Sequence, residues 1–438
     1  MSFSPGEKAV DVAAEQWPRA GASPSPQAPA EGDRPQAAEP VGSARGWRAF
    51  LTRRGRRADR APSDRFLLLL TLCLVGLGIV MIYSASAIRA QERFGDPTFF
   101  LKKQLVYACV GLLAMAWAVG RDLRTFQRLT PILFLGSLLL LLLVLVPHVG
   151  IRVNGARRWI RLFGFSFQPA ELAKVAVILF LASYFARRQD RLNDFLDGFV
   201  PPLCMIGLMV GLIILQPNFG TAVILLFAAG ALFFVGGARI NHLLATAGAA
   251  LPVLAFLIMR SAHGKTRLLA LLDPARVSAK ATYQLDQSFN ALGPGGLFGR
   301  GLGDSMQKLF FLPEPHTDFI FAIVGEEMGF VGAMLVVVLF GLFLWRGMRA
   351  AARAGDAYAS YLAMGITALI VGQAALNMAV VSGLLPTTGV PLPFVSFGGS
   401  SLTLTLFGVG ILLNVSRGSA PSSPAWAPVR GERPSRTE

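Results

Sequence analysis

The sequence predicts an all-α protein that crosses a membrane about ten times. Of its 438 residues, 53% are hydrophobic and only 15% are charged, and the mean hydropathy of +0.54 lies far above that of soluble globular proteins. The apolar residues gather in runs of about 16 to 25, the length that spans a hydrocarbon core of about 30 Å. Because helices satisfy their own backbone inside lipid, these runs indicate a helical bundle.

The chain divides into one membrane domain and two polar tails. Residues 1–64 are rich in Pro, Ala, Gly and Arg and can bury little apolar surface, so we predict a disordered tail. Residues 65–417 form the membrane domain, and residues 418–438 form a second disordered tail. The ten predicted spans are 66–87, 104–119, 131–146, 169–186, 200–215, 219–236, 243–259, 318–345, 358–382 and 393–415.

Arginine positions predict the orientation of the bundle. Four arginines within residues 53–57 precede the first span, which favours a cytoplasmic N-terminus by the positive-inside bias. Ten spans then return the C-terminus to the cytoplasm. The arginine-rich connections 121–128, 187–191 and 346–353 fall on the same side. We therefore expect a multi-pass protein of the cell inner membrane with both termini inside.

Two loops that this topology places outside, in the periplasm, carry unexpected charge. Residues 147–168 contain four arginines and no acid, and the large loop 261–317, between the seventh and eighth spans, contains six basic and four acidic residues. An anionic ligand or anionic lipid headgroups would each explain such a loop. Because the net charge of +16 is carried by tails and connections, we expect no nucleic acid partner.

The first outer loop contains groups suited to phosphate. Arg157 and Arg158 follow a turn signal, and guanidinium forks match phosphate oxygens. Trp159 is a residue type that favours the membrane interface.

The fourth span is predicted to begin sharply at Pro169, with Glu171 near the positive end of the helix dipole. Lys174 lies three residues after Glu171, on the same helix face. The two can form an ion pair within the helix, or Lys174 can line a substrate site, because ionisable residues inside membranes usually face a polar cavity. The residues alone leave both roles open.

The eighth span is approached through two prolines, which place Asp318 at its start. A carboxylate there either interacts favourably with the positive end of the helix dipole and caps free amides, or serves as a general base that faces water or substrate. Glu326 and Glu327 are expected about 12 Å deeper on a straight helix, in buried polar contacts between helices.

Nucleotide and metal chemistry find little support. The glycines of segments 293–296 and 299–303 lack the Lys-Ser/Thr of a phosphate-binding loop, so we expect them to let the backbone fold tightly at the membrane surface. Cys73, Cys109 and Cys204 lie in apolar runs without ligand spacing, which predicts neither a disulfide framework nor a metal site.

These motifs together resemble one family, the SEDS proteins (shape, elongation, division and sporulation), from residue 66 to residue 417. Within it, segment 301–309 looks more like the division member than the elongation member. The segments that carry the resemblance are 83–86, 155–160, 167–174, 216–221, 312–321 and 386–401.

The resemblance implies a peptidoglycan glycosyltransferase that joins lipid II units by β-1,4 bonds at the division septum and releases undecaprenyl pyrophosphate. Asp318 would be the catalytic residue and would accept the proton of the acceptor hydroxyl. Arg157, Arg158 and Lys174 would neutralise the departing pyrophosphate, a task that a divalent cation, Mg²⁺ or Mn²⁺, can share.

The resemblance also implies further substrate-binding residues and partners. The partners are lipid II and the nascent glycan strand, a class B penicillin-binding protein that supplies the transpeptidase, and other membrane proteins of the division machinery. The further residues are Trp159, Gln168, Glu171, Gln216, Lys308, His316, Thr317, Ser396 and Ser400.

Two other functions fit the same sequence. A transporter that flips lipid II is compatible with ten spans and intramembrane charges. A non-catalytic division scaffold would depend on the N-terminal tail more than on Asp318.

Overall fold

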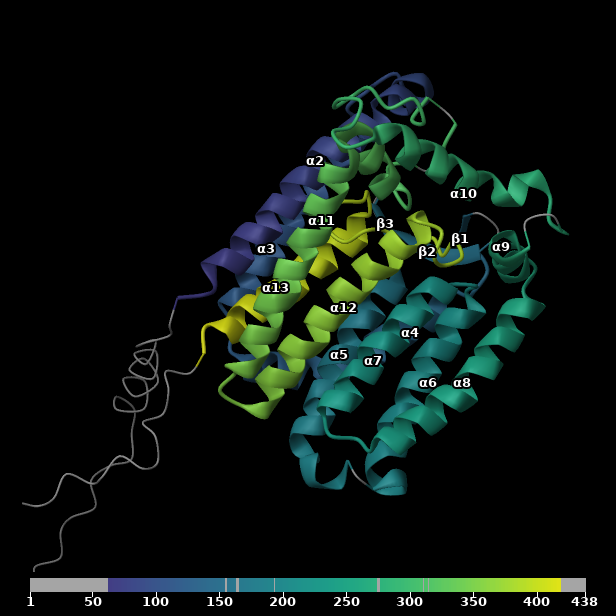
Figure 1. Ribbon diagram of the computed structural model, residues 1–438. Coiled ribbons are helices and arrows are strands. Elements are labelled where there is room, and N and C mark those ends of the chain that lie inside the picture. The colour runs from purple at the N-terminus through teal and green to yellow at the C-terminus, as the bar shows by residue number, and fades with distance from the viewer. Residues whose placement is uncertain are drawn as a thin grey trace, which may run out of the picture. The chain divides into compact units, whose positions relative to one another are not determined.

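The computed structural model describes residues 62–153, 156–162, 165–192, 194–273, 276–309, 311–313 and 315–418 (Figure 1). The chain separates into two compact units, Met1–Ala58 and Asp59–Glu438, and all described residues belong to the second. Nearly all of the two predicted disordered tails lies outside the described residues.

Membrane-length helices dominate the described part of the chain. Nine helices there are long and apolar enough to cross a membrane, and a tenth apolar helix, α7, is shorter. This confirms the predicted all-α polytopic membrane architecture. The ten are α2 (Arg65–Phe94), α3 (Phe99–Val119), α4 (Leu123–Leu143), α5 (Pro169–Arg187), α6 (Val200–Leu215, continuing the π-helical turn Phe195–Phe199), α7 (Phe219–Val235), α8 (Ile240–Arg260), α11 (Ile320–Ala352), α12 (Ala357–Val381) and α13 (Gly399–Ser416).

Some helix ends differ from the predicted span ends, because the limits of an apolar run and the limits of a helix are not the same. Helix α4 begins at Leu123 and not at residue 131, so Arg124 and Arg128 lie on its first two turns. Hydropathy marks the stretch that crosses lipid, whereas a helix continues into its polar flank. Helix α13 begins at Gly399 and not at residue 393, because Pro391 and Pro393 keep the preceding segment out of the helical region.

The two loops that were predicted outside are structured. Residues 147–168 contain an antiparallel sheet of β1 (Gly150–Val153), β2 (Ala156–Leu162) and β3 (Phe165–Phe167), in that order, with Gly150 opposite Ile160 and Ile160 opposite Phe167. The large loop forms α9 (Ala262–Leu272), α10 (Ala279–Leu292) and a 3-10 turn, η5 (Gly293–Gly295). We call the end of the bundle that carries this sheet, α9 and α10 the sheet end.

Helix α11 is two helices that meet at Gly329, whose backbone is left-handed (φ 66°, ψ −164°). A straight helix would place Phe343 about 34 Å from Ile320. However, the ring of Phe343 lies 5.9 Å from that of Phe394, and the His316 carbonyl accepts a hydrogen bond from Phe397 N at 2.8 Å. Residues 394–397 reach about 11 Å at most, so the chain must turn back at Gly329.

The glycine-rich segment fills this turn with backbone hydrogen bonds. Arg300 N and Gly301 N donate to the carbonyls of Glu326 and Glu327, both at 3.0 Å, while Phe330 N donates to the Gly296 carbonyl at 2.9 Å. The glycines therefore fold the loop against helix α11, and the predicted tight packing involves protein backbone. Glu326 and Glu327 lie close to the turn, which corrects the prediction that they are deeper than Asp318.

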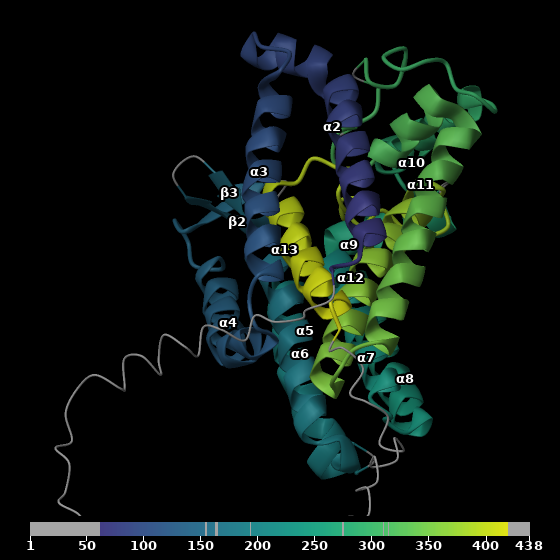
Figure 2. The same cartoon turned by 90° about the vertical axis from the view of Figure 1, so that its left-hand side faces the viewer.

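Helix α13 lies at the centre of the bundle, packed on α3, α12, α11 and α5 (Figure 2). Gly410 permits its close approach to α3, because a Cβ there would lie 2.5 Å from the Met115 carbonyl oxygen. Asn414 closes the same contact by donating to the Ala118 carbonyl at 2.8 Å. Helix α8 is the opposite case: along its whole described length, Ile240–Arg260, no residue is buried.

Candidate active site

Asp318 is half-buried in the turn before α11, where α12 holds its backbone. Asn377 of α12, 1% exposed, donates from Nδ2 to the carbonyls of Asp318 and Val390, both at 2.8 Å. A Cβ at Gly389, which is left-handed (φ +75°), would lie 3.5 Å from Asp318 Oδ2. The segment before α13 therefore passes directly beside the carboxylate.

Two arginines from distant parts of the chain interact with this carboxylate: Arg158 of β2 and Arg267 of α9. Arg158 Nε donates to the Gln216 carbonyl at 2.9 Å, and Arg267 Nη1 donates to the Thr387 carbonyl at 3.2 Å. These bonds fix both guanidinium groups without neutralising them.

The charge state of the arginines follows from burial and from each other. Burial and, to a smaller extent, the nearby Arg267 lower the pKa of Arg158 to about 10, against the opposing effect of Asp318. Burial also lowers the pKa of Arg267, again against Asp318. Both remain cationic at neutral pH. Two cations around one carboxylate leave a net positive charge, which suits an anionic ligand.

Arg157 does not share this position with Arg158. Neighbouring residues of a strand point to opposite faces, and Arg157 Nη1 donates to the Leu145 carbonyl at the end of α4 at 3.4 Å. Trp159, two residues after Arg157, lies on the same face of the strand as Arg157 and is half-buried. Strand geometry therefore separates the two arginines that the sequence analysis paired.

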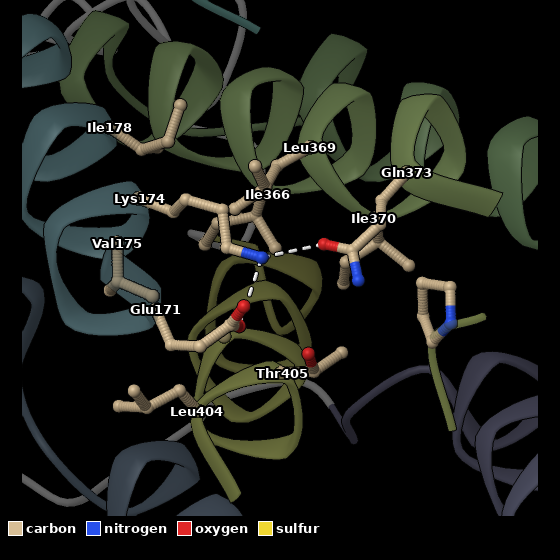
Figure 3. Close-up of a pocket in the computed structure, with 12 residues that line it drawn as sticks. Glu171, Lys174, Val175, Ile178, Ile366, Leu369, Ile370, Gln373, Leu404 and Thr405 are labelled. Carbon is tan, nitrogen blue, oxygen red and sulfur yellow. Dashed lines mark hydrogen bonds and ion pairs between the residues drawn. The ribbon is translucent and has the colours of Figure 1, made fainter. Parts of the chain in front are cut away.

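Glu171 and Lys174 form a buried ion pair at 2.9 Å, with side chains 5% and 4% exposed. Lys174 Nζ also donates to Gln373 Oε1 of α12 at 2.6 Å, so the amine lies between the two oxygens (Figure 3). The surrounding cavity measures about 20 Å³, room for about one water. Lys174 therefore forms the intrahelical pair beside a small cavity that is lined mostly by apolar side chains, and its role in a substrate site stays a prediction.

This ion pair is connected to Asp318 through one face of α12. Gln373 Nε2 donates to the Pro391 carbonyl at 2.9 Å, and Asn377, one turn further, binds the adjacent carbonyl of Val390. The same Asn377 amide holds the backbone of Asp318. A continuous set of polar contacts thus runs from the Glu171–Lys174 pair to the Asp318 backbone.

Three further predicted residues bind backbone groups around the site with their side chains, and one of these groups is the amide of a fourth predicted residue, Gln168. Ser400 Oγ accepts from Gln168 N at 3.3 Å, and Ser396 Oγ accepts from Leu392 N at 2.8 Å. Gln216 donates from its side chain to the Leu141 carbonyl at 3.1 Å. These contacts shape the segments that meet at Asp318, and the Gln216 carbonyl orients Arg158.

His316 and Thr317 lead into Asp318 in different environments. His316 is 4% exposed, and its ring centroid lies 4.5 Å from that of Phe100 and 5.8 Å from that of Phe397. Burial, followed by the nearby positive charge of Arg89, lowers the pKa of His316 to about 4. The imidazole is therefore neutral at physiological pH. Thr317 is half-buried.

Lys308 lies in a separate buried cluster that joins the large loop to two helices. Its Nζ is 3.2 Å from Glu327 Oε1 and 3.4 Å from Ser84 Oγ of α2. Ser84 also donates to Glu327 at 2.6 Å. Glu326 accepts from Met306 N at 2.8 Å. Buried polar contacts of these two glutamates were predicted, but the structure places Lys308 with Glu327 near the turn of α11.

Sequence reasoning missed several residues of the site. Gln373 and Asn377 carried a usable signal, because two carboxamides four residues apart mark one face of an otherwise apolar span. Arg267 was counted only as part of a loop's charge, and nothing in its local sequence indicates that α9 approaches Asp318. Among the described residues, no group of three or more His, Cys, Asp or Glu side chains could hold a metal ion.

The fold and the site define a multi-pass membrane protein with a carboxylate and two guanidinium groups at the sheet end of its helices. A family model described as "Cell cycle protein", for the FtsW, RodA and SpoVE proteins, matches residues 65–420. The chain therefore belongs to this family, which is the SEDS family that its motifs resemble.

Relatives and solved structures agree with this assignment. The chain is 44% identical over 360 residues to the "Probable peptidoglycan glycosyltransferase FtsW" of Geobacter sp. (strain M18), covering 82% of this chain and 98% of the relative. It is also 44% identical over 358 residues, with the same coverage, to the "Stage V sporulation protein E" of Bacillus subtilis (strain 168).

Two solved structures share the fold across most of their length. The rod shape determining protein RodA of Thermus thermophilus matches with a TM-score of 0.62 and 32% identity, over 83% of this chain and 98% of that one. A chain described under "Structural coordination of polymerization and crosslinking by a peptidoglycan synthase complex" matches with a TM-score of 0.65 and 32% identity, over 81% and 98%.

Proposed function

We propose that this protein is a peptidoglycan glycosyltransferase that polymerises lipid II into β-1,4-linked strands. The observation that carries the proposal is the half-buried Asp318 carboxylate, which interacts with the guanidinium groups of both Arg158 and Arg267. The carboxylate can accept a proton, and the two guanidinium groups can bind a diphosphate. The names of the relatives and the family membership support the same activity.

In the proposed step, Asp318 accepts the proton of the acceptor's 4-hydroxyl group as that oxygen attacks the anomeric carbon of the donor. The bond from that carbon to the pyrophosphate oxygen breaks, and undecaprenyl pyrophosphate leaves with the electron pair. Arg158 and Arg267 would stabilise the negative charge that develops on the diphosphate. Lys174, which binds Glu171 and Gln373, would act through the contacts that hold the Asp318 backbone.

No step of this reaction is assigned to a metal. The residues around Asp318 offer one carboxylate and two cations, a set that does not fit a protein-held divalent ion. Any Mg²⁺ or Mn²⁺ would need most of its ligands from the lipid diphosphate.

The cellular setting is part of the proposal. The arginine-rich connections support cytoplasmic termini and a sheet end that faces the periplasm. The solved synthase complex, which coordinates polymerization and crosslinking, supports a class B penicillin-binding protein as partner. We propose that the activity lies at the division septum, which agrees with the description "Cell cycle protein" of the matching family model.

The test is polymerisation of lipid II by the purified protein with its transpeptidase partner in liposomes, measured by the gel pattern of glycan strands. Asp318→Asn keeps the size of the side chain but removes the base, so we expect a rate loss of about 100-fold or more. Arg267→Gln should lower the polymerisation rate by a similar factor, because the negative charge that develops on the diphosphate loses one of the two cations that stabilise it.

Two matched controls use exposed residues of the same large loop. Asp304→Asn and Arg276→Gln should polymerise like the unaltered protein, since both side chains lie on the surface. A wild-type rate for Asp318→Asn would refute the enzyme. If that variant instead polymerised normally but failed to move lipid II across the liposome membrane, the transporter alternative would hold.

A further inference from the structure

A second cavity, of about 470 Å³, opens between α10, η5, the end of the large loop and α11. This volume is that of a typical small-ligand pocket. Its lining is set apart from Asp318, Arg158 and Arg267, none of which contributes to it. The polar lining residues are Gln287, Asn290, Arg300, Gln307 and Glu326, and Phe311 contributes an aromatic face.

The wall formed by α10 is fixed in place. Ser288 Oγ, fully buried, donates to the Val381 carbonyl at the end of α12 at 2.8 Å. One turn further along α10, Leu292 fills the space beside Gly325, where a Cβ would lie 2.5 Å from Leu292 Cδ2. With this face of α10 anchored, Gln287 and Asn290 line the cavity from a rigid helix.

The opposite wall is held by Glu326, which is 1% exposed. Its carboxylate accepts from Met306 N at 2.8 Å and from Ser305 Oγ at 2.5 Å, and it lies 3.7 Å from Arg300 Nη1. Gln307 Oε1 is buried without a hydrogen-bond partner among the described residues. The Gln307 side chain still lines the cavity, next to Met306 and Glu326.

The chemistry of this lining matches a sugar better than a free anion. Three carboxamides both donate and accept, as hydroxyl and acetamido groups require. The single guanidinium of Arg300 is offset by Glu326, so the cavity lacks the positive excess found at Asp318. Phe311, 50% exposed, offers an apolar face to the flat side of a sugar ring.

The cavity is also close to the proposed catalytic centre. Val381, which anchors α10, is four residues along α12 from Asn377, a rise of about 6 Å. Asn377 holds the Asp318 backbone. Because α9 carries Arg267 and α10 follows it in the chain, the same loop serves both places.

We propose that this cavity binds N-acetylated sugars of the growing glycan strand and holds the strand between successive additions. The inference rests on the proposed polymerase function. If the cavity no longer binds the strand, the strand should leave the protein early. The product strands should then be shorter, while the first addition proceeds at its normal rate.

The test uses the full-length protein in nanodiscs, with chitotetraose, an oligomer of N-acetylglucosamine, as the binding probe. Gln287→Ala combined with Asn290→Ala should weaken probe binding about 30-fold, because two lost hydrogen bonds of about 1 kcal/mol each add to about 2 kcal/mol. In the lipid II assay with the partner, the same variant should make shorter strands. Gln284→Ala, the same substitution one turn earlier on α10 and outside the cavity, is the matched control.

The outcomes separate this inference from the proposed function. Asp318→Asn should abolish polymer yet bind the probe normally, so a failed polymerase would not hide the cavity. Unchanged probe affinity and strand length in the double variant would overturn the inference. The inference would also be overturned if the double variant kept its probe affinity and strand length but no longer bound the transpeptidase partner, since the cavity would then be a protein docking surface.

Discussion

At the scale of single residues, the two guanidinium groups beside Asp318 differ in how far the sequence reveals them. Arg158 stands in a motif that the family resemblance makes visible, and its carbonyl partner at Gln216 was also singled out. Arg267 comes from α9, more than one hundred residues later, and only tertiary packing brings it to the Thr387 carbonyl. The sequence therefore predicts which chemical groups the site contains better than it predicts which residues supply them.

His316 gives the protein a predictable response to acid. Its pKa is about 4 in the folded protein and about 6.5 when unfolded. Between these values the unfolded chain binds a proton that the folded chain does not, so stability falls as the pH drops from 6.5 toward 4. At pH 5 the loss from this residue should be about 2 kcal/mol.

Thermal unfolding in detergent between pH 7.5 and 5 measures this effect. His316→Gln should flatten the dependence, because it removes the titrating ring, while His148→Gln, at an exposed histidine, should leave it unchanged. An equal slope in all three proteins would show that His316 is not the source.

Residue pairs also show where sequence reasoning stops. Glu171 and Lys174 were recognised as neighbours from their spacing, and the ion pair forms. Arg157 and Arg158 were grouped because they are adjacent, yet adjacency on a strand separates their side chains. The difference lies in the secondary structure: spacing of three on a helix brings groups together, and spacing of one on a strand divides them.

At the scale of elements, the turn in α11 depends on glycine at two facing positions. A Cβ at Gly299 would lie 2.1 Å from the Glu327 carbonyl oxygen, and a Cβ at Gly329 would lie 2.3 Å from Gly299 N. Both residues also have positive φ, at +82° and +66°. No side chain fits between these backbones.

Gly299→Ala and Gly329→Ala should therefore each lower the free energy of unfolding by about 2 kcal/mol or more. The control is Gly341→Ala, later in the same helix, where a Cβ meets nothing within 4 Å. That variant should be neutral or slightly stabilising. Thermal stability in detergent is the measurement, and tolerance of alanine at Gly299 would contradict the described backbone contacts.

Hydropathy could not have revealed this element. Apolar residues continue on both sides of Gly329, so the pattern predicts one straight span from 318 to 345, as the sequence analysis proposed. The reversal is imposed by the 296–301 segment, which supplies hydrogen-bond partners for the interrupted helix. The sheet and helices α9 and α10 were missed for a related reason: membrane-length periodicity carries no information about structured loops.

At the scale of the whole bundle, Asp64 joins three helices at the end opposite the sheet. It caps α2 by accepting from Phe66 N and Leu67 N, both at 3.0 Å. Its Oδ2 accepts from Arg346 Nε of α11 at 2.7 Å, and its backbone N donates to Ser416 Oγ of α13 at 3.0 Å. The first, last and kinked helices thus meet at one residue.

Asp64→Ala removes the cap and the partly buried ion pair together, so we expect a loss of about 2 kcal/mol in the free energy of unfolding. Glu92→Ala, at an exposed carboxylate near the other end of α2, is the control and should change stability little. Equal unfolding temperatures for the two variants in detergent would contradict the role of Asp64.

The number and type of membrane helices follow from the sequence because apolar run length reports the bilayer directly. Their arrangement does not, since lipid-facing and protein-facing apolar residues look alike in sequence. The central position of α13 depends on small residues such as Gly410, whose importance appears only when α3 is placed beside it.

Helix α8 has no buried residue along its described length, and it continues through Ser261 into α9, which carries Arg267. Packing within the described chain therefore constrains its lateral position little. A change in bilayer thickness would tilt such a helix more readily than its packed neighbours. We therefore expect bilayer thickness to act on α9 through this helix, against the hydrogen bond that holds the Arg267 guanidinium at the Thr387 carbonyl.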